Sequence, residues 1–186
     1  MPITSMKDGS TGISVALNNN YMEPIATTLV GSGGSSTIIF NDIPQTYKHL
    51  QIRGIMRCSA ASDNILIRFN SDIAANYAWH VLRGNGTAAS AAAVANASSG
   101  ELGWTTYSGQ TTSAFAGAVI DILDYTNTIK YKTVRSLSGG DVNGAGTITL
   151  GSSLWQNTNS VNSITIVMGS GNFEQYSRLS LYGIKG

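Results

Sequence analysis

The chain is 186 residues long, a length that suits one domain with a sizeable hydrophobic core. Charged residues make up only 11% of it and the formal net charge is +1, which argues against a nucleic-acid-binding surface. The sequence shows neither a signal-peptide pattern nor an apolar stretch long enough to cross a membrane. Cys58 is the only cysteine, so no internal disulfide holds the fold, which is compatible with synthesis in a reducing cytosol.

Residues 1–30 differ in pattern from the rest, and we treat them as an extended N-terminal segment in front of a domain at 31–186. The segment carries scattered apolar residues, and only 25–30 has the pattern of a short strand. Two interpretations stand side by side: a frayed terminus, or an arm that becomes ordered on a neighbouring protein. In the second interpretation the residues expected to be buried at the contact are Ile13, Val15, Leu17 and Tyr21.

The strand expected at the centre of the fold covers residues 48–57. Pro44 fixes its own backbone angle and keeps the preceding residue extended, so no helix runs through this point. After it the side chains alternate, with Leu50, Ile52 and Met56 on one face and His49, Gln51, Arg53 and Arg57 on the other. This period of two predicts a half-buried strand with one wet face. Gly54 lies on the apolar face, which indicates a bulge or the close approach of another group.

The rest of the chain repeats short apolar or alternating runs between turn residues. Further strands are expected over 36–41, 64–70, 76–83, 101–107, 114–124, 130–138, 145–150, 161–168 and 175–184. The run 114–124 is almost entirely apolar, so we expect a strand that is buried on both faces. The small-residue run 84–100 has no amphipathic stripe and is expected to be a long loop with at most one helical turn.

Nine or ten short strands at this spacing, with almost no helix, predict an all-β fold. The expected architecture is an antiparallel two-sheet β-sandwich, jelly-roll-like, with the extended N-terminal arm attached. The core of this sandwich is expected to contain Leu50, Ile52, Phe69, Val119, Ile148, Ile166 and Leu181.

The sequence points to no catalytic, cofactor or metal site. His49 and His80 lie on different expected strands, and no spacing typical of a zinc site is present. A G-x-S-x-G motif is absent, and Asp121 and Asp124 fall on opposite faces of a strand, which does not suit paired carboxylate chemistry. The run 139–144 has two oxygen ligands among glycines, but a plain hairpin connection is favoured over a calcium loop.

Three tryptophans leave two interpretations open. Exposed aromatic rings on a β-sandwich can stack on sugar rings, and buried ones supply much of a sandwich's core area. The candidate glycan-stacking residues are Trp79, Trp104 and Trp155.

Most of the domain resembles a family found in structural proteins of tailed bacteriophages, particularly phages of cyanobacteria and other aquatic bacteria. The resemblance covers about residues 36–186 and leaves 1–30 outside. The stretches that carry it are 42–54, 67–72, 76–80, 119–125, 130–136 and 180–186.

The resemblance implies a non-enzymatic virion protein, made in the host cytoplasm and located on the outer surface of the particle. A small sandwich with an arm is similar to capsid cement or decoration proteins, which bind the major capsid protein or another virion protein and commonly form homotrimers. The alternative is a tail-fibre or baseplate adhesin that binds host surface glycan. Neither implies a cofactor, nucleic acid or a membrane as partner.

Overall fold

The structure is a computed structural model that describes residues 21–61 and 64–186. Within these ranges the chain forms thirteen strands and no helix. The strands in chain order are β1 (Met22–Leu29), β2 (Thr37–Phe40), β3 (His49–Cys58), β4 (Asn64–Phe69), β5 (Tyr77–Gly84), β6 (Ala89–Ala97), β7 (Gly100–Trp104), β8 (Thr106–Tyr107), β9 (Ala116–Leu123), β10 (Lys132–Asp141), β11 (Gly146–Trp155), β12 (Ile164–Met168) and β13 (Arg178–Ile184).

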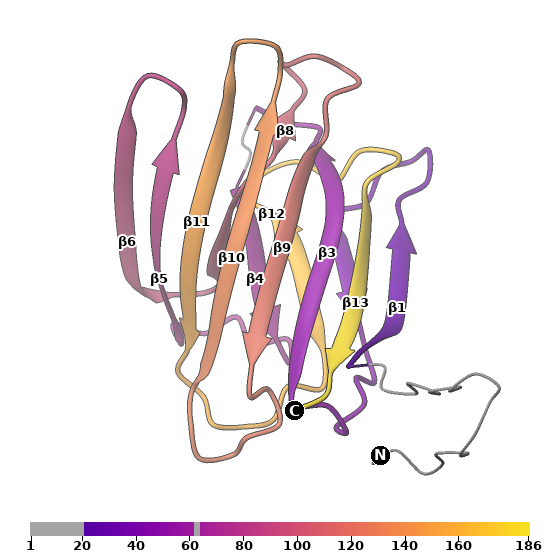
Figure 1. The fold of residues 1–186 in the computed structure, drawn as a ribbon, viewed down its shortest axis with the longest axis vertical. Coiled ribbons are helices and arrows are strands. Elements are labelled where there is room, and N and C mark those ends of the chain that lie inside the picture. Colours follow the sequence, from indigo (N-terminus) through magenta and orange to yellow (C-terminus); the bar gives the residue numbers. More distant parts are fainter. Residues whose placement is uncertain (1–20, 62–63) are drawn as a thin grey trace, which may run out of the picture.

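Two sheets face each other, as Figure 1 shows with the larger one in front. The large sheet has the strand order β1-β13-β3-β9-β10-β11-β5-β6, and the small sheet has the order β2-β12-β4-β7. Neighbouring strands are antiparallel throughout both orders, and the short β8 adds to the end of β3 in parallel. The expected antiparallel two-sheet β-sandwich is therefore confirmed. Its jelly-roll subtype stays a prediction.

Alternation along each strand places one set of side chains between the sheets. The central strand behaves as expected, because Leu50, Ile52 and Met56 have no exposed surface. Gly54 also fits the expectation of a close approach, because a Cβ added there would lie 2.0 Å from the backbone oxygen of Arg178. Of the expected core residues, those fully buried are Leu50, Ile52, Phe69, Ile166 and Leu181.

Two expected core residues are not in the core. Val119 is 37% exposed and Ile148 is 59% exposed, and both point away from the small sheet. The expectation that 114–124 is buried on both faces was wrong for the same reason. In β9 only alternate residues are buried, among them Ile120 and Ile122, because the small sheet covers one side of the large sheet.

The run 84–100 is not a loop, since it contains the nine-residue strand β6. β6 pairs antiparallel with β5 from Ala89, opposite Gly84, to Ala97, opposite Tyr77. Alanine is a poor strand former by propensity, so hydrogen bonding to a neighbouring strand decides the conformation here.

Residues 22–29 belong to the large sheet, although the sequence pattern assigned them to the arm. β1 pairs with β13 from Met22, opposite Ile184, to Leu29, opposite Arg178. The sandwich therefore includes the chain from Met22 onward. The predicted arm contacts Ile13, Val15 and Leu17 lie outside the described residues.

Candidate interaction surface

The outer face of the large sheet carries aliphatic side chains where an isolated protein would carry polar ones. Val119 of β9 lies opposite Leu137 of β10. Leu137 lies opposite Leu150 of β11, which in turn lies opposite Leu82 of β5. These four side chains, called the apolar row below, are 37% to 54% exposed. Soluble monomers rarely expose large contiguous apolar patches, so the row is a candidate contact with another molecule.

A groove of about 920 Å³ lies beside the apolar row. Its floor contains Gly117 and Gly139, which face each other across β9 and β10. Ile55 of β3 pairs with Gly117, and Ile148 of β11 pairs with Gly139, so an isoleucine stands at each side of the floor. A Cβ added at Gly117 would meet no atom within 4 Å, so the space above it is open. The groove can receive aliphatic side chains of a partner.

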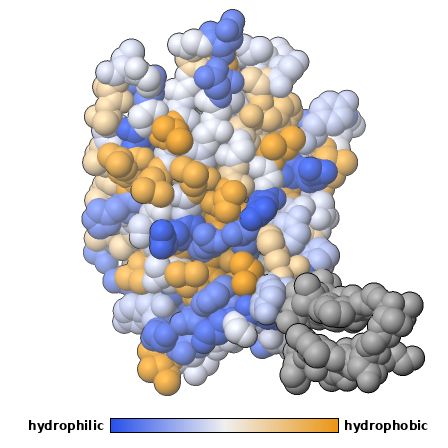
Figure 2. Space-filling view, in the orientation of Figure 1, coloured by the Kyte–Doolittle hydropathy of each residue, from blue (hydrophilic) through white to orange (hydrophobic). Residues whose placement is uncertain are grey.

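Polar side chains form a second row on the other side of the apolar row. This polar row runs across the sheet through Gln51, Asp121, Arg135, Ser152 and His80. Gln51 donates from Nε2 to Oδ1 of Asp121 at 2.6 Å. Arg135 lies directly opposite Asp121 in the ladder but makes no ion pair with any residue in the described part of the chain. Figure 2 shows this face with orange patches above a blue belt that crosses the front of the molecule.

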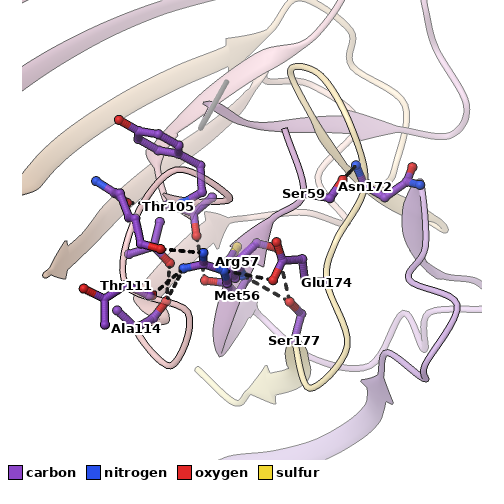
Figure 3. A network of polar contacts seen from close by, with 12 residues as sticks. Met56, Arg57, Ser59, Thr105, Thr111, Ala114, Asn172, Glu174 and Ser177 are labelled. Atoms are coloured by element: carbon purple, nitrogen blue, oxygen red, sulfur yellow. Dashed lines mark hydrogen bonds and ion pairs between the residues drawn. The ribbon is translucent and has the colours of Figure 1, made fainter. Parts of the chain in front are cut away.

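Arg57 is a buried cation at the upper end of β3, although the sequence pattern placed it on the wet face. Its side chain is 2% exposed, and Nε lies 2.9 Å from Oε2 of Glu174. The other guanidinium nitrogens donate to backbone oxygens of the loop after β8, and these acceptors are Gln110, Thr111 and Ala114. Figure 3 shows how the guanidinium reaches both segments. This network fixes two loops to the sheet and leaves the guanidinium no contact for a ligand.

A smaller, more polar pocket of about 250 Å³ lies between the β10–β11 hairpin and the segment around β8. Trp104 and Tyr107 both line it, together with the amide side chains of Asn85 and Gln110. The Arg83 guanidinium carbon lies 4.5 Å from the centre of the Trp104 ring, so one face of that ring is taken. An aromatic ring with hydroxyl and amide groups around it has the chemistry of a sugar site.

Glu101 is a buried carboxylate close to this pocket. It is 1% exposed and pairs with Arg83. Burial raises the pKa of the Glu101 carboxyl, and the attraction of Arg83 partly offsets that rise. The pair therefore holds β5 and β7 together at the polar end of the interior.

The structure separates the three candidate tryptophans. Trp155 is 1% exposed, donates to Oδ2 of Asp72 at 2.7 Å and packs against Phe69 and Tyr77, so it belongs to the core. Trp79 lies on β5, opposite Val94 of β6. Trp104 is the one of the three that lines the small polar pocket.

Other sequence candidates fall in separate places. Tyr21 is 65% exposed, and its backbone oxygen accepts a hydrogen bond from the backbone nitrogen of Lys185 at 2.9 Å. Nδ1 of His49 accepts from the Asp124 backbone nitrogen at 2.9 Å, whereas His80 lies four strands away on β5. Among the described residues, no three His, Cys, Asp or Glu side chains are grouped closely enough to hold a metal ion.

Sequence reasoning missed the apolar row, although a signal for it was present. Leu137 shares a face with Arg135 and Thr133, and a large aliphatic on a polar face is the pattern to look for. The same anomaly recurs at Leu150 and Leu82 on the neighbouring strands.

The fold and this surface define a class: an all-β sandwich whose larger sheet exposes an apolar row and a groove. Comparison adds no closer identification, because no known family model, curated protein or solved structure matches the chain. Within the ranges described, no helix has the length and apolar character needed to cross a membrane.

Proposed function

We propose that this chain is a non-enzymatic structural protein of a tailed-bacteriophage virion, of the capsid cement or decoration type. It binds the outer shell through its N-terminal arm, with the major capsid protein or another virion protein as its partner. The resemblance of residues 36–186 to phage structural proteins supports this role. The observation that carries it is the apolar row with its adjoining groove, because such a surface suits a subunit that works packed against other proteins.

The arm is continuous in sequence with an edge of the sandwich. Tyr21 leads into β1, which is an edge strand of the large sheet. Ile13, Val15 and Leu17 are the apolar residues of the arm that we expect to be buried at the contact. Twenty residues reach at most about 70 Å when extended, which is enough to reach a neighbouring subunit.

Deletion of residues 1–20 tests the anchor. The deletion ends before Met22, because loss of β1 would expose the edge of β13 and confuse binding with folding. The truncated protein should keep its thermal melting temperature but fail to bind virions that lack the native protein. A sharper variant replaces Ile13, Val15 and Leu17 with Ser. Its matched control changes the residues between them, with Ser14 replaced by Ala and Ala16 replaced by Ser. Binding by the triple variant equal to that of the control would contradict the anchoring role.

Copy number tests the location in the particle. A shell protein should be present in purified virions at a ratio to the major capsid protein that is close to stoichiometric. A far lower ratio on a quantitative gel would favour a tail component instead.

The alternative function is a tail-fibre or baseplate adhesin that binds host glycan. The pocket lined by Trp104 and Tyr107 favours this candidate specifically, because it joins aromatic and amide groups in one small site. Replacement of Trp104 with Ala should abolish binding on a glycan array if the pocket holds a sugar. Trp79→Ala is the control, since Trp79 lies outside the pocket.

A further inference from the structure

We propose that the outer face of the large sheet pairs with the same face of a second copy of this chain, about a two-fold axis that runs along the strands between β9 and β10. This inference rests on the proposed role of the face in assembly, and it names the partner. It concerns the purified protein, so its test does not need a virion.

The strand register makes the paired residues of β9 and β10 complementary about that line. Asp121 lies opposite Arg135, Val119 opposite Leu137, and Gly117 opposite Gly139, all across β9 and β10. A two-fold axis along the strands exchanges β9 and β10 without moving residues along the strand direction. Each residue of one strand then lies over its own ladder partner in the second copy.

Charge complementarity selects this axis over an axis along β9 or along β10. The operation places Asp121 over the partner's Arg135, and it does so twice because the contact is isologous. An axis along β9 would oppose two copies of Asp121, and an axis along β10 would oppose two copies of Arg135. Arg135 is exposed and makes no ion pair with the described residues of its own chain, so its guanidinium is available to a partner carboxylate.

Part of the apolar surface follows the same symmetry, whereas Leu150 meets the aliphatic stem of the partner's Arg53, the β3 residue that pairs with Val119. Ile55 and Ile148 stand one strand outside β9 and β10, each paired with a glycine of the groove floor. The order across the sheet is therefore isoleucine, glycine, glycine, isoleucine, which the two-fold axis maps onto itself. Val119 then packs on the partner's Leu137, again twice. Two sheets that pack face to face in this way lie about 10 Å apart and interdigitate their side chains.

An isologous contact of this kind closes as a dimer. A homotrimer, which the sequence led us to expect, needs a contact between two different patches around a three-fold axis. Such a contact does not bring Arg135 onto the partner's Asp121, so the two assemblies respond differently to exchange of these charges.

Charge exchange tests the proposal on the full chain. Sedimentation velocity at micromolar concentration should show a dimer for the wild type. Asp121→Arg and Arg135→Asp should each weaken dimerisation by about tenfold or more, since each single change opposes like charges across the axis. The double variant D121R/R135D restores opposite charges and should dimerise like the wild type. Arg68→Asp, on the outer side of the small sheet, is the control and should leave the dimer intact.

Three results would overturn the proposal. They are a wild type that is a monomer or a trimer, a folded double variant that stays dissociated, and loss of the dimer on deletion of residues 1–20. The last result would mean that the arm, and not the face by itself, holds the two copies together. Circular dichroism of each variant separates lost pairing from lost folding. A failure here would leave virion copy number unchanged, so it is distinguishable from a failure of the proposed function.

Discussion

The two faces of the large sheet are built by the same strands, but one face is buried and the other is exposed. In β9, Ile120 has no exposed surface and its neighbour Val119 is 37% exposed. In β3, Ile52 has no exposed surface and Ile55 is 44% exposed. Both faces carry aliphatic residues, so hydropathy does not distinguish them. The difference comes from the small sheet, which covers one face and leaves the other exposed.

Two arginines on the outer side of the large sheet also differ in burial. Arg57 points to the outer side of β3 but is buried, because the loop after β8 and Glu174 cover it. Arg178 lies on the outer side of β13 and is exposed. Position along the strand therefore sets the direction of a side chain, and the covering segment sets its burial.

The largest difference in stability should come from substituting one isoleucine on each face of the large sheet. Ile120→Ala should lower the free energy of unfolding by about 2–5 kcal/mol, because it removes buried methyl groups and leaves a cavity between the sheets. Ile148→Ala removes the same groups from a side chain that is 59% exposed and should change stability by about 0.5 kcal/mol or less. Urea denaturation, at a concentration where the protein is monomeric, gives both values. Equal losses would mean that the outer face is as well packed as the inner one.

The second largest difference in stability should come from removal of the buried Arg57 guanidinium. Arg57→Met should cost about 3 kcal/mol, because it strands three backbone oxygens and leaves the Glu174 carboxylate, which is 29% exposed, without its partner. The matched change at the surface, Arg178→Met, should cost about 0.5 kcal/mol or less. Thermal and urea denaturation measure both. A near-neutral Arg57→Met would show that the loop network of Figure 3 contributes little to the fold.

A glycine on each face provides the third comparison. Gly54→Ala should cost about 1–3 kcal/mol or more, since the new Cβ would lie 2.0 Å from a backbone oxygen and 2.6 Å from Cδ2 of Leu179. Gly117→Ala meets no atom within 4 Å and should be close to neutral. The measurement is again the free energy of unfolding. A neutral Gly54→Ala would require β13 to shift away from β3 without loss of pairing.

Much of this fold was predictable because a period of two is local information. The alternation at Leu50, Ile52 and Met56 identified the central strand and its buried face. In the structure Lys132 lies beside Val134 on the inward face of β10. The partners of Lys132 were not predictable, since its ammonium donates to backbone oxygens of Asn127, Lys130 and Thr158 in loops without a sequence pattern.

The wrong predictions share one cause. Whether a second strand or sheet packs against a segment cannot be read from the sequence of that segment alone. Val119 and Ile148 have side chains that a core accepts, and nothing in their own strands says that the small sheet lies on the other side. β6 was missed because its alanines are poor strand formers and β5 supplies the hydrogen bonds that order them. The groove was missed for the same reason, since it combines Gly117 and Gly139 from separate strands.

The smallest predicted effect concerns an ionic cluster at the end of β9, where charges meet outside the core. Lys130 donates to Oδ2 of Asp124 at 2.7 Å, and Lys48 lies 3.1 Å from Oδ1. Hydrogen bonds from Lys130 first and Lys48 second lower the pKa of the Asp124 carboxyl from 3.8 to about 2. Because the folded-state pKa is below the unfolded one, the stability that Asp124 contributes is present above the unfolded pKa and is lost as the pH falls toward the folded pKa.

Asp124→Asn should therefore flatten the loss of stability between pH 3.8 and about 2, as measured by thermal melting across that range. Lys130→Met should flatten it in the same way, because it removes the partner whose hydrogen bond lowers the Asp124 pKa most. Wild-type acid sensitivity in both variants would show that these exposed charges, unlike Arg57 in its buried network, do not couple to folding.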